Sequence, residues 1–175
     1  RNFRFIYDET RIYYIRLREN GGIAENTNSG MDLAKGDWIG FMDHDDLLAP
    51  NALYELAMAV IQDKEIEAIY TDEDQVEEKK DREMIHQKPH FKPDYSPDLL
   101  RSNNYITHFF CVKGDLLDRV GGFRKEFDGA QDYDFILRCT EAAKKVHHIP
   151  KVLYHWRIHS GSTADNPMSK SYAYK

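Results

Sequence analysis

The feature that most constrains this chain is a short apolar run that passes directly into an acidic cluster. Residues 38–42 read Trp-Ile-Gly-Phe-Met, and Asp43, Asp45 and Asp46 follow at once. An almost continuously apolar run of this length predicts a strand that is buried on both faces. Three carboxylates at the end of such a strand repel one another, and a divalent cation with oxygen ligands relieves that repulsion. The alternative is a solvated acidic turn that caps the next helix, because aspartate is favoured at helix starts.

Apolar periodicity in the first half of the chain predicts alternating strands and helices. Strands are predicted at residues 12–17, 38–42 and 66–70, and helices at residues 23–34 and after Pro50. This order implies an α/β layer fold with mostly parallel strand pairing, in which a ligand binds beyond the carboxyl ends of the strands. The apolar positions of the second helix fall on one face, and they are Leu53, Leu56, Ala57, Val60 and Ile61.

The second half of the chain is predicted to begin irregularly and then to become regular again. The charged run at residues 77–83 predicts a solvated loop, and prolines between residues 89 and 97 predict an extended segment with little regular structure. The later elements are predicted as a strand at 105–112, a short helix at 116–120, a helix at 131–143 and a strand at 151–158. Residues 164–175 are expected to be a tail on a single domain.

Composition excludes several classes of protein. Acidic side chains number 30 against 24 basic ones, and the net charge of -6 argues against a nucleic-acid binder. No stretch approaches the ~18–20 uninterrupted apolar residues that a transmembrane helix needs. Cys111 and Cys139 are too few for a disulfide scaffold and sit in apolar runs, which predicts buried free thiols in a reducing cytoplasm.

Two further acidic clusters carry candidate chemistry. Residues 72–74 read Asp-Glu-Asp after a predicted strand, and they suggest a second ligand set, a clamp for an acceptor hydroxyl or an exposed turn. Asp132 and Asp134 fall in the first turn of a predicted helix, where the helix dipole favours carboxylates. One of these two acids held at the helix start could act as a general base on a substrate hydroxyl, and simple capping of the helix is the alternative.

A basic and aromatic segment near the C-terminus is the last candidate. On a strand, His155, Arg157 and His159 share one face because side chains alternate with a period of two. A neutral histidine can complete a metal site and an arginine can hold a diphosphate, whereas a polar strand edge is the structural alternative. No special role is predicted for the remaining histidines, including His86, His90, His108, His147 and His148.

Taken together, these motifs resemble the family 2 glycosyltransferases, which have the GT-A nucleotide-sugar fold. An ordered set of segments carries the resemblance: Glu19-Asn20-Gly21-Gly22-Ile23-Ala24 with Asn28, Asp43-His44-Asp45-Asp46 as a form of the DXD motif, Gly121-Gly122-Phe123, Gln131-Asp132-Tyr133-Asp134-Phe135 and His155-Trp156-Arg157-x-His159-x-Gly161-Ser162. Residues 70–74 and 91–100 resemble a bacterial branch associated with cell-surface polysaccharide assembly. The resemblance implies an α/β fold with a mixed, Rossmann-like sheet flanked by helices, and an inverting, metal-dependent transfer of a sugar to an acceptor hydroxyl.

The resemblance also implies a role for each matching residue. Asp132 is expected to be the base that deprotonates the acceptor, and Asp45 with His159 is expected to bind the Mn²⁺ or Mg²⁺ that bridges the diphosphate. The residues expected to bind the donor are Asn20, Gly22, Asn28, Asp43, Asp46 and Arg157. The residues expected near the acceptor are Asp72, Asp74 and Asp134.

Partners and location follow from the same resemblance. The donor is expected to be a UDP- or dTDP-sugar, and the acceptor a glycan or a lipid-linked molecule. The full-length protein is expected in the cytoplasm, with peripheral association at the inner face of the membrane. Family members begin with a strand and an aspartate-containing segment that hold the nucleotide base, so the chain is expected to be truncated at its N-terminus and inactive as it stands. Two alternatives stay open: a non-catalytic carbohydrate- or nucleotide-binding fragment, and a haloacid-dehalogenase-type phosphatase, because an apolar strand followed by Asp-x-Asp also opens that fold.

Overall fold

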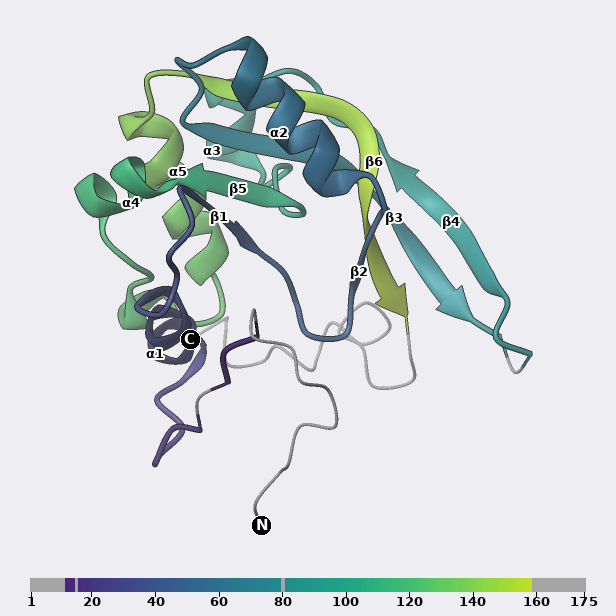
Figure 1. Ribbon diagram of the computed structural model, residues 1–175, viewed down its shortest axis with the longest axis horizontal. Helices are drawn as coiled ribbons and strands as arrows, with labels where there is room; N and C mark the ends of the chain where they lie inside the picture. Colours follow the sequence, from purple (N-terminus) through teal and green to yellow (C-terminus); the bar gives the residue numbers. More distant parts are fainter. Residues whose placement is uncertain (1–11, 15, 80, 159–175) are drawn as a thin grey trace.

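The computed structural model describes residues 12–14, 16–79 and 81–158, and these form one mixed sheet with helices on both faces (Figure 1). The sheet order is β1-β5-β3-β6-β2, with β4 pairing β3 off this path. The strands are β1 (Trp38–Phe41), β2 (Leu47–Leu48), β3 (Ala68–Glu78), β4 (Met84–His90), β5 (Phe110–Lys113) and β6 (Val146–Ile158). The helices are α1 (Ile23–Met31), α2 (Ala52–Gln62), α3 (Pro97–Ser102), α4 (Gly114–Val120), α5 (Gln131–Ala142) and the short 3₁₀ helix η1 (Lys125–Phe127).

Alternation of side chains along the central strands builds one core on each face of the sheet. On β3, Tyr70 belongs to the core shared with α3, α4 and α5, and its neighbour Ile69 belongs to the core under α2. On β5, Phe110 belongs to the first of these cores and Cys111 to the core under α2. Both cysteines are buried and free, as predicted, and burial raises the pKa of each thiol to about 12.

Strand direction differs from the prediction. Only β3 and β6 pair in parallel among the described strands, and the other pairs are antiparallel. β5 lies between β1 and β3 and runs opposite to both. The prediction of mostly parallel pairing was therefore wrong, because an apolar strand pattern carries no information about direction.

Burial of β1 also differs from the prediction. The strand forms at residues 38–41 as expected, but it lies at the end of the sheet order and pairs with β5 alone within the described part of the chain. Gly40 is exposed and its neighbours are half-buried. An edge strand with one apolar neighbour has the same composition as a central one, so the sequence pattern overstated its burial.

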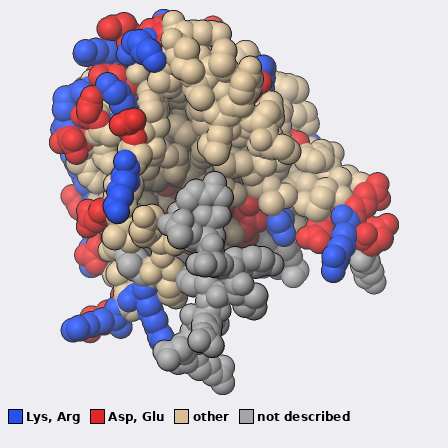
Figure 2. Space-filling view, in the orientation of Figure 1, with Lys and Arg blue, Asp and Glu red and all other residues tan. Residues whose placement is uncertain are grey.

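An apolar groove runs between β1 and α2. The predicted apolar face of α2 is confirmed as one face, since its five residues line a cavity of about 550 Å³ together with Trp38, Met42 and Phe109. Two of those five, Leu53 and Ile61, are 70% and 61% exposed. Figure 2 shows largely uncharged surface over α2, whereas charged side chains gather over α4 and α5.

The segment at residues 72–90 differs most from the sequence prediction. β3 continues to Glu78 and turns back into β4, so residues 72–74 lie inside a strand and the predicted loop at 77–83 belongs largely to a hairpin. Cross-strand pairing, which local composition does not reveal, stabilises these polar residues as strand. The proline-rich segment contains the helix α3, which Ser96 caps by accepting from the backbone N–H of Leu99.

Most of the other predicted helices and strands are present, and one predicted strand is not. The predicted helices correspond to α1, α2, α4 and α5, and the predicted strand at 151–158 is the second half of β6. The predicted strand at 12–17 is wrong for its described residues, which form no strand and are exposed. A run with high β propensity becomes a strand only when a neighbour pairs with it.

The predicted tail and His159 lie outside the described residues. No described helix has the length and apolar character needed to span a membrane.

Candidate active site

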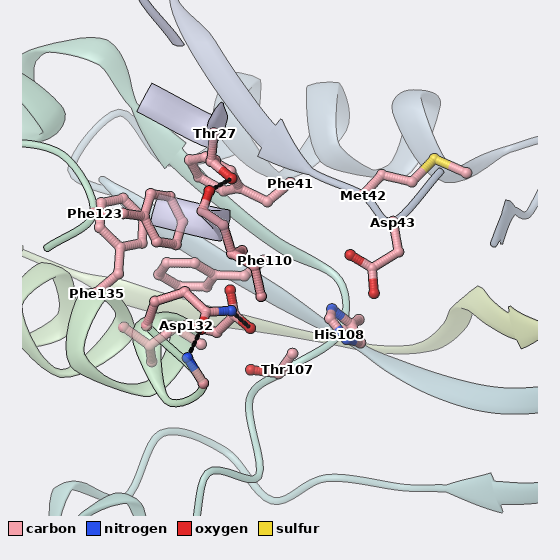
Figure 3. A pocket seen from close by; sticks show the side chains of 14 residues that line it. Thr27, Phe41, Met42, Asp43, Thr107, His108, Phe110, Phe123, Asp132 and Phe135 are labelled. Carbon is pink, nitrogen blue, oxygen red and sulfur yellow. Dashed lines mark hydrogen bonds between the residues drawn. The ribbon is translucent and has the colours of Figure 1, made fainter. Parts of the chain in front are cut away.

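A cavity of about 310 Å³ opens where β1, α1 and the start of α5 meet. Asp43 enters it from the turn after β1 and Asp132 from the first turn of α5, and His108 lies between them in the view of Figure 3. Phenylalanine rings form the apolar wall, with Phe123 and Phe135 stacked at 4.4 Å between ring centroids. The fold thus brings two carboxylates from distant parts of the sequence into one partly apolar cavity.

The acidic turn after β1 separates its three carboxylates. Asp43 lines the cavity, and the side chain of Asp45 is 35% exposed. Asp46 is buried and accepts hydrogen bonds from the Tyr154 hydroxyl and from the backbone N–H of Arg157 at 2.8 Å. Burial raises the pKa of Asp46, and the neighbouring acidic charges add to the increase, while these two hydrogen bonds oppose it.

The acidic turn is only partly solvated. Asp46 is buried, Asp45 is half-buried, and Asp43 is exposed where it lines the cavity. The backbone N–H of Asp43 donates to the Tyr154 hydroxyl at 3.2 Å, which fixes the turn against β6. The roles of Asp43 and Asp45 toward a donor or a cation stay predictions.

The two acids at the start of α5 have different surroundings. Asp132 accepts from the Gln131 side chain at 3.0 Å and lines the cavity. Asp134 lies 2.7 Å from the Arg138 guanidinium and 3.6 Å from Arg124, and it does not line the cavity. The first turn of α5 thus supplies one carboxylate to the cavity and one to an ion pair that holds the helix.

His108 also lines the cavity, although the sequence predicted no role for it. Its ring stacks on Tyr154 at 4.9 Å, and its backbone N–H donates to the Glu73 carboxylate at 2.5 Å. Its backbone carbonyl accepts from the Lys92 ammonium group. These contacts join residues that are far apart in the sequence, so no local motif marks His108.

Lys92 supports this part of the cavity wall from inside the protein. Its side chain is fully buried, donates to the Ile106 carbonyl at 2.9 Å as well as to that of His108, and lies 3.8 Å from Glu73. Burial lowers the pKa of Lys92 to about 8, against the opposing effect of nearby carboxylates.

We expect the wild-type protein to gain stability relative to Lys92→Met as the pH rises from about 7 to about 10. Folded Lys92 loses its proton near pH 8, whereas the unfolded chain holds it to about 10.5. The unfolded state therefore binds more protons in this window, and a higher pH favours the folded state by up to about 3 kcal/mol. Urea denaturation at each pH measures the difference in the free energy of unfolding between the two proteins.

Lys88→Met is the control, because it makes the same change at an exposed position of β4. The difference in the free energy of unfolding between wild type and Lys88→Met should not depend on pH in this way. A wild-type minus Lys92→Met difference that stays flat with pH would contradict a buried charge.

Near α1, the three residues expected to bind the donor, Asn20, Gly22 and Asn28, contact other residues of the protein. Asn20 accepts from the backbone N–H of Gly22 at 3.1 Å, and Asn28 exchanges two hydrogen bonds of 2.8 Å with the backbone of Phe123. Gly22 has a φ of 95°, and a Cβ there would lie 2.4 Å from Asp128, whose carboxylate accepts from the first turn of α1. These contacts join α1 to the loop before α5, and the donor roles of Asn20, Gly22 and Asn28 stay predictions.

Two more expected site residues are tied into the sheet. The Arg157 guanidinium lies 3.4 Å from Glu78, and its Nε atom is buried and has no hydrogen-bond partner among the described residues. Asp72 is buried and lies 2.8 Å from His148 Nε2, and it also accepts from the backbone N–H of Lys92 at 2.9 Å. The exposed-turn interpretation of residues 72–74 was therefore wrong, and the acceptor role of Asp72 stays a prediction.

Metal-ligating side chains gather at one further place. The expected pairing of Asp45 with His159 involves a residue outside the described part of the chain. Within the described part, Asp74, His86 and His155 each offer a ligand atom within 4.8 Å of the others. This group includes an expected acceptor residue and a histidine for which no role was predicted.

Comparison with known proteins agrees with the fold and the motifs. The family model described as glycosyl transferase family 2 matches residues 2–121. Over 156 residues the chain is 42% identical to the O-antigen biosynthesis protein RfbC of Myxococcus xanthus, which covers 89% of this chain and 12% of that protein. It is 29% identical over 159 residues to the chondroitin synthase of Pasteurella multocida, covering 91% of this chain and 16% of that protein. The chain thus spans less than a fifth of the length of these curated relatives.

The fold also resembles a solved glycosyltransferase structure. S. aureus TarS in complex with UDP-GlcNAc superposes with a TM-score of 0.62 at 18% identity, over 83% of this chain and 42% of that one. Identity this low supports the shared fold alone, and the predicted GT-A fold is confirmed. The phosphatase alternative is left without support. Because the family model matches more than half of the chain, the chain belongs to glycosyl transferase family 2.

Proposed function

We propose that this chain forms the catalytic part of an inverting, metal-dependent glycosyltransferase that extends a bacterial cell-surface polysaccharide. The observation that carries the proposal is that Asp43 and Asp132 line one cavity although they come from distant parts of the sequence. A transferase of this type needs a donor-binding carboxylate and a general base on opposite sides of the reacting carbon. In the view of Figure 3, Asp43 and Asp132 lie on opposite sides of His108 in this cavity.

Asp132 is the proposed general base. The acceptor hydroxyl attacks the anomeric carbon of the donor as the bond from that carbon to the diphosphate oxygen breaks, and the hydroxyl proton passes to Asp132. Attack opposite to the leaving group inverts the anomeric centre. A positioned base contributes about 10²–10⁴-fold to such a step. The hydrogen bond from Gln131 supports this role because it orients the carboxylate.

Asp45, with Asp43 beside it, is proposed to meet the cation and the donor. Hard oxygen ligands suit Mn²⁺ and Mg²⁺, which take one or two carboxylates together with substrate phosphates. The partial exposure of Asp45 and the position of Asp43 in the cavity fit this requirement. A cation bound there neutralises the charge that develops on the leaving diphosphate. Asn20, Gly22, Asn28, Asp46 and Arg157 would then shape and support the donor side, and His159 is the proposed second metal ligand.

The names of similar proteins support the substrate class. One relative is named for O-antigen biosynthesis and another as a chondroitin synthase, which favours a growing glycan as acceptor. The acceptor roles proposed for Asp72, Asp74 and Asp134 rest on the family resemblance alone. The TarS structure contains UDP-GlcNAc, which favours a UDP-sugar donor. The buried free thiols fit a reducing compartment, and we place the reaction on the cytoplasmic side, at the inner face of the membrane where a lipid-linked acceptor is reached.

Release of nucleoside diphosphate from a panel of sugar nucleotides tests the proposal. The full-length protein is incubated with UDP- and dTDP-sugars, with Mn²⁺, with Mg²⁺ or with a chelator. We expect release from at least one donor, dependent on the cation and faster when a glycan acceptor is added. Donor binding without turnover under all conditions would favour a non-catalytic binding module.

A further inference from the structure

Three adjacent strands bring two imidazoles and a carboxylate together on one face of the sheet. Asp74 on β3 pairs directly with His155 on β6. On the other side of β3, His86 on β4 lies opposite Val76, two positions beyond Asp74 and so on the same face as that residue. The order β4-β3-β6 therefore places all three side chains in one cluster.

The distances within this cluster are those of a compact ligand set. His155 Nδ1 lies 2.6 Å from one oxygen of Asp74, and His86 Nδ1 lies 2.9 Å from the other. The two rings are 4.7 Å apart between centroids and nearly perpendicular, at 77°. Protein ligands lie about 2.0–2.2 Å from a bound Zn²⁺, so three of them lie within about 3.5 Å of one another. Binding of one ion would require small side-chain rotations that move the imidazoles away from the carboxylate oxygens.

We propose that Asp74, His86 and His155 bind one Zn²⁺ ion, with a fourth coordination position open to solvent. Two imidazole nitrogens and one carboxylate oxygen suit Zn²⁺, whereas Mg²⁺ prefers oxygen ligands alone. The Asp74 and His155 side chains are 10% and 14% exposed and are held by the sheet, while His86 is 51% exposed and gives the ion a path from solvent.

This ligand set shares no residue with the acidic turn in which the donor cation is proposed. Tyr154 and Trp156 flank His155 in the sequence and pack against the core under α2. Because side chains alternate along a strand, His155 projects from the opposite face of β6. Tyr154, whose hydroxyl donates to Asp46, therefore projects from the face of β6 opposite to the cluster. The zinc proposal does not depend on the proposed function.

The ion would tie a hairpin to the centre of the sheet. In the described part of the chain, β4 pairs with β3 alone. A metal held by His86 and His155 joins β4 to β6, two strands that do not pair with each other. Zinc binding is therefore expected to slow amide hydrogen exchange in β4 as well as to occupy the site.

Zinc titration of the untagged, chelator-treated full-length protein tests the proposal, with competition against a chromogenic chelator as readout. His86→Ala is the test variant, because its exposed position keeps the change from disturbing the fold. His90→Ala is the matched control: His90 is also on β4 and is 46% exposed, but it pairs with Glu73. Thermal unfolding without metal verifies that both variants fold.

We expect wild type and His90→Ala to bind one more zinc ion per chain at micromolar or lower concentration than His86→Ala, or to bind it at least 10-fold more tightly. Excess Mg²⁺ should not displace this ion, and zinc should slow amide exchange in β4 of wild type but not of His86→Ala. Equal zinc binding by wild type and His86→Ala would overturn the proposal, as would an equal loss in His90→Ala. Displacement by Mg²⁺ would overturn it as well, since it would assign the ion to an oxygen site.

Discussion

Replacing Asp132 with asparagine is expected to lower the rate of sugar transfer by about 10²–10⁴-fold while the donor still binds. Asparagine has nearly the same shape as aspartate and can keep the contact with Gln131, but it cannot accept the proton of the acceptor hydroxyl. The loss should therefore appear in turnover and not in the affinity for donor. Steady-state transfer rates and donor titration of the same preparations separate the two effects.

Asp115→Asn is the matched control for this variant. Asp115 also lies in the first turn of a helix, α4, but its side chain is 71% exposed and pairs with Lys113 outside the cavity. The same change of charge at a helix start should leave the transfer rate close to wild type. Wild-type turnover in Asp132→Asn, or a loss of donor binding as large as the loss of turnover, would contradict the role of Asp132 as base.

Replacing Asp45 with asparagine is expected to weaken Mn²⁺-dependent binding of UDP by at least about 10-fold. The amide oxygen is a weaker ligand than the carboxylate and carries no charge to attract the cation. Affinity for UDP without metal should change little, because Asp45 is proposed to act through the cation. Calorimetric titration of UDP with and without Mn²⁺ measures both quantities.

Asp81→Asn controls for the general change in charge. Asp81 lies in the turn between β3 and β4, is exposed and is not part of the cavity. It should leave the gain in UDP affinity from Mn²⁺ at the wild-type value. An equal gain in wild type and Asp45→Asn would show that the cation binds elsewhere or that it does not support donor binding.

The parts of the site with local sequence signals could be predicted. The strand at residues 38–41 with its acidic turn and the acids at the start of α5 are marked by a few adjacent residues. These elements could be predicted because a few neighbouring residues determine where a helix starts and where a strand ends. The cavity that joins Asp43 to Asp132 could be expected only from the family resemblance.

The remaining features depend on contacts between distant segments. Asp46 is adjacent to Asp45 in the sequence, yet it points inward because Tyr154 reaches it from β6. The sequence around Lys92 predicts an exposed charge in a proline-rich segment, but the side chain is buried behind His108. Propensity and periodicity describe single segments, and strand direction, hairpin pairing and buried polar networks arise only when segments meet.

The same reason explains the cluster on β3, β4 and β6. His86 falls next to a charged run that predicts a loop, and its proximity to Asp74 becomes visible only through the β3–β4 register. Asp74 and His155 are separated by most of the second half of the chain, although they are direct neighbours in the sheet. Sequence spacing alone gives no metal-binding signature for these three residues.

The most direct test of the central claim is the position of Mn²⁺ in crystals of the full-length protein grown with UDP. We expect an anomalous manganese peak in contact with Asp45 and the diphosphate, with the Asp132 carboxylate facing the same cavity from the start of α5. A peak away from Asp45, or an Asp132 side chain turned out of the cavity that holds UDP, would contradict it.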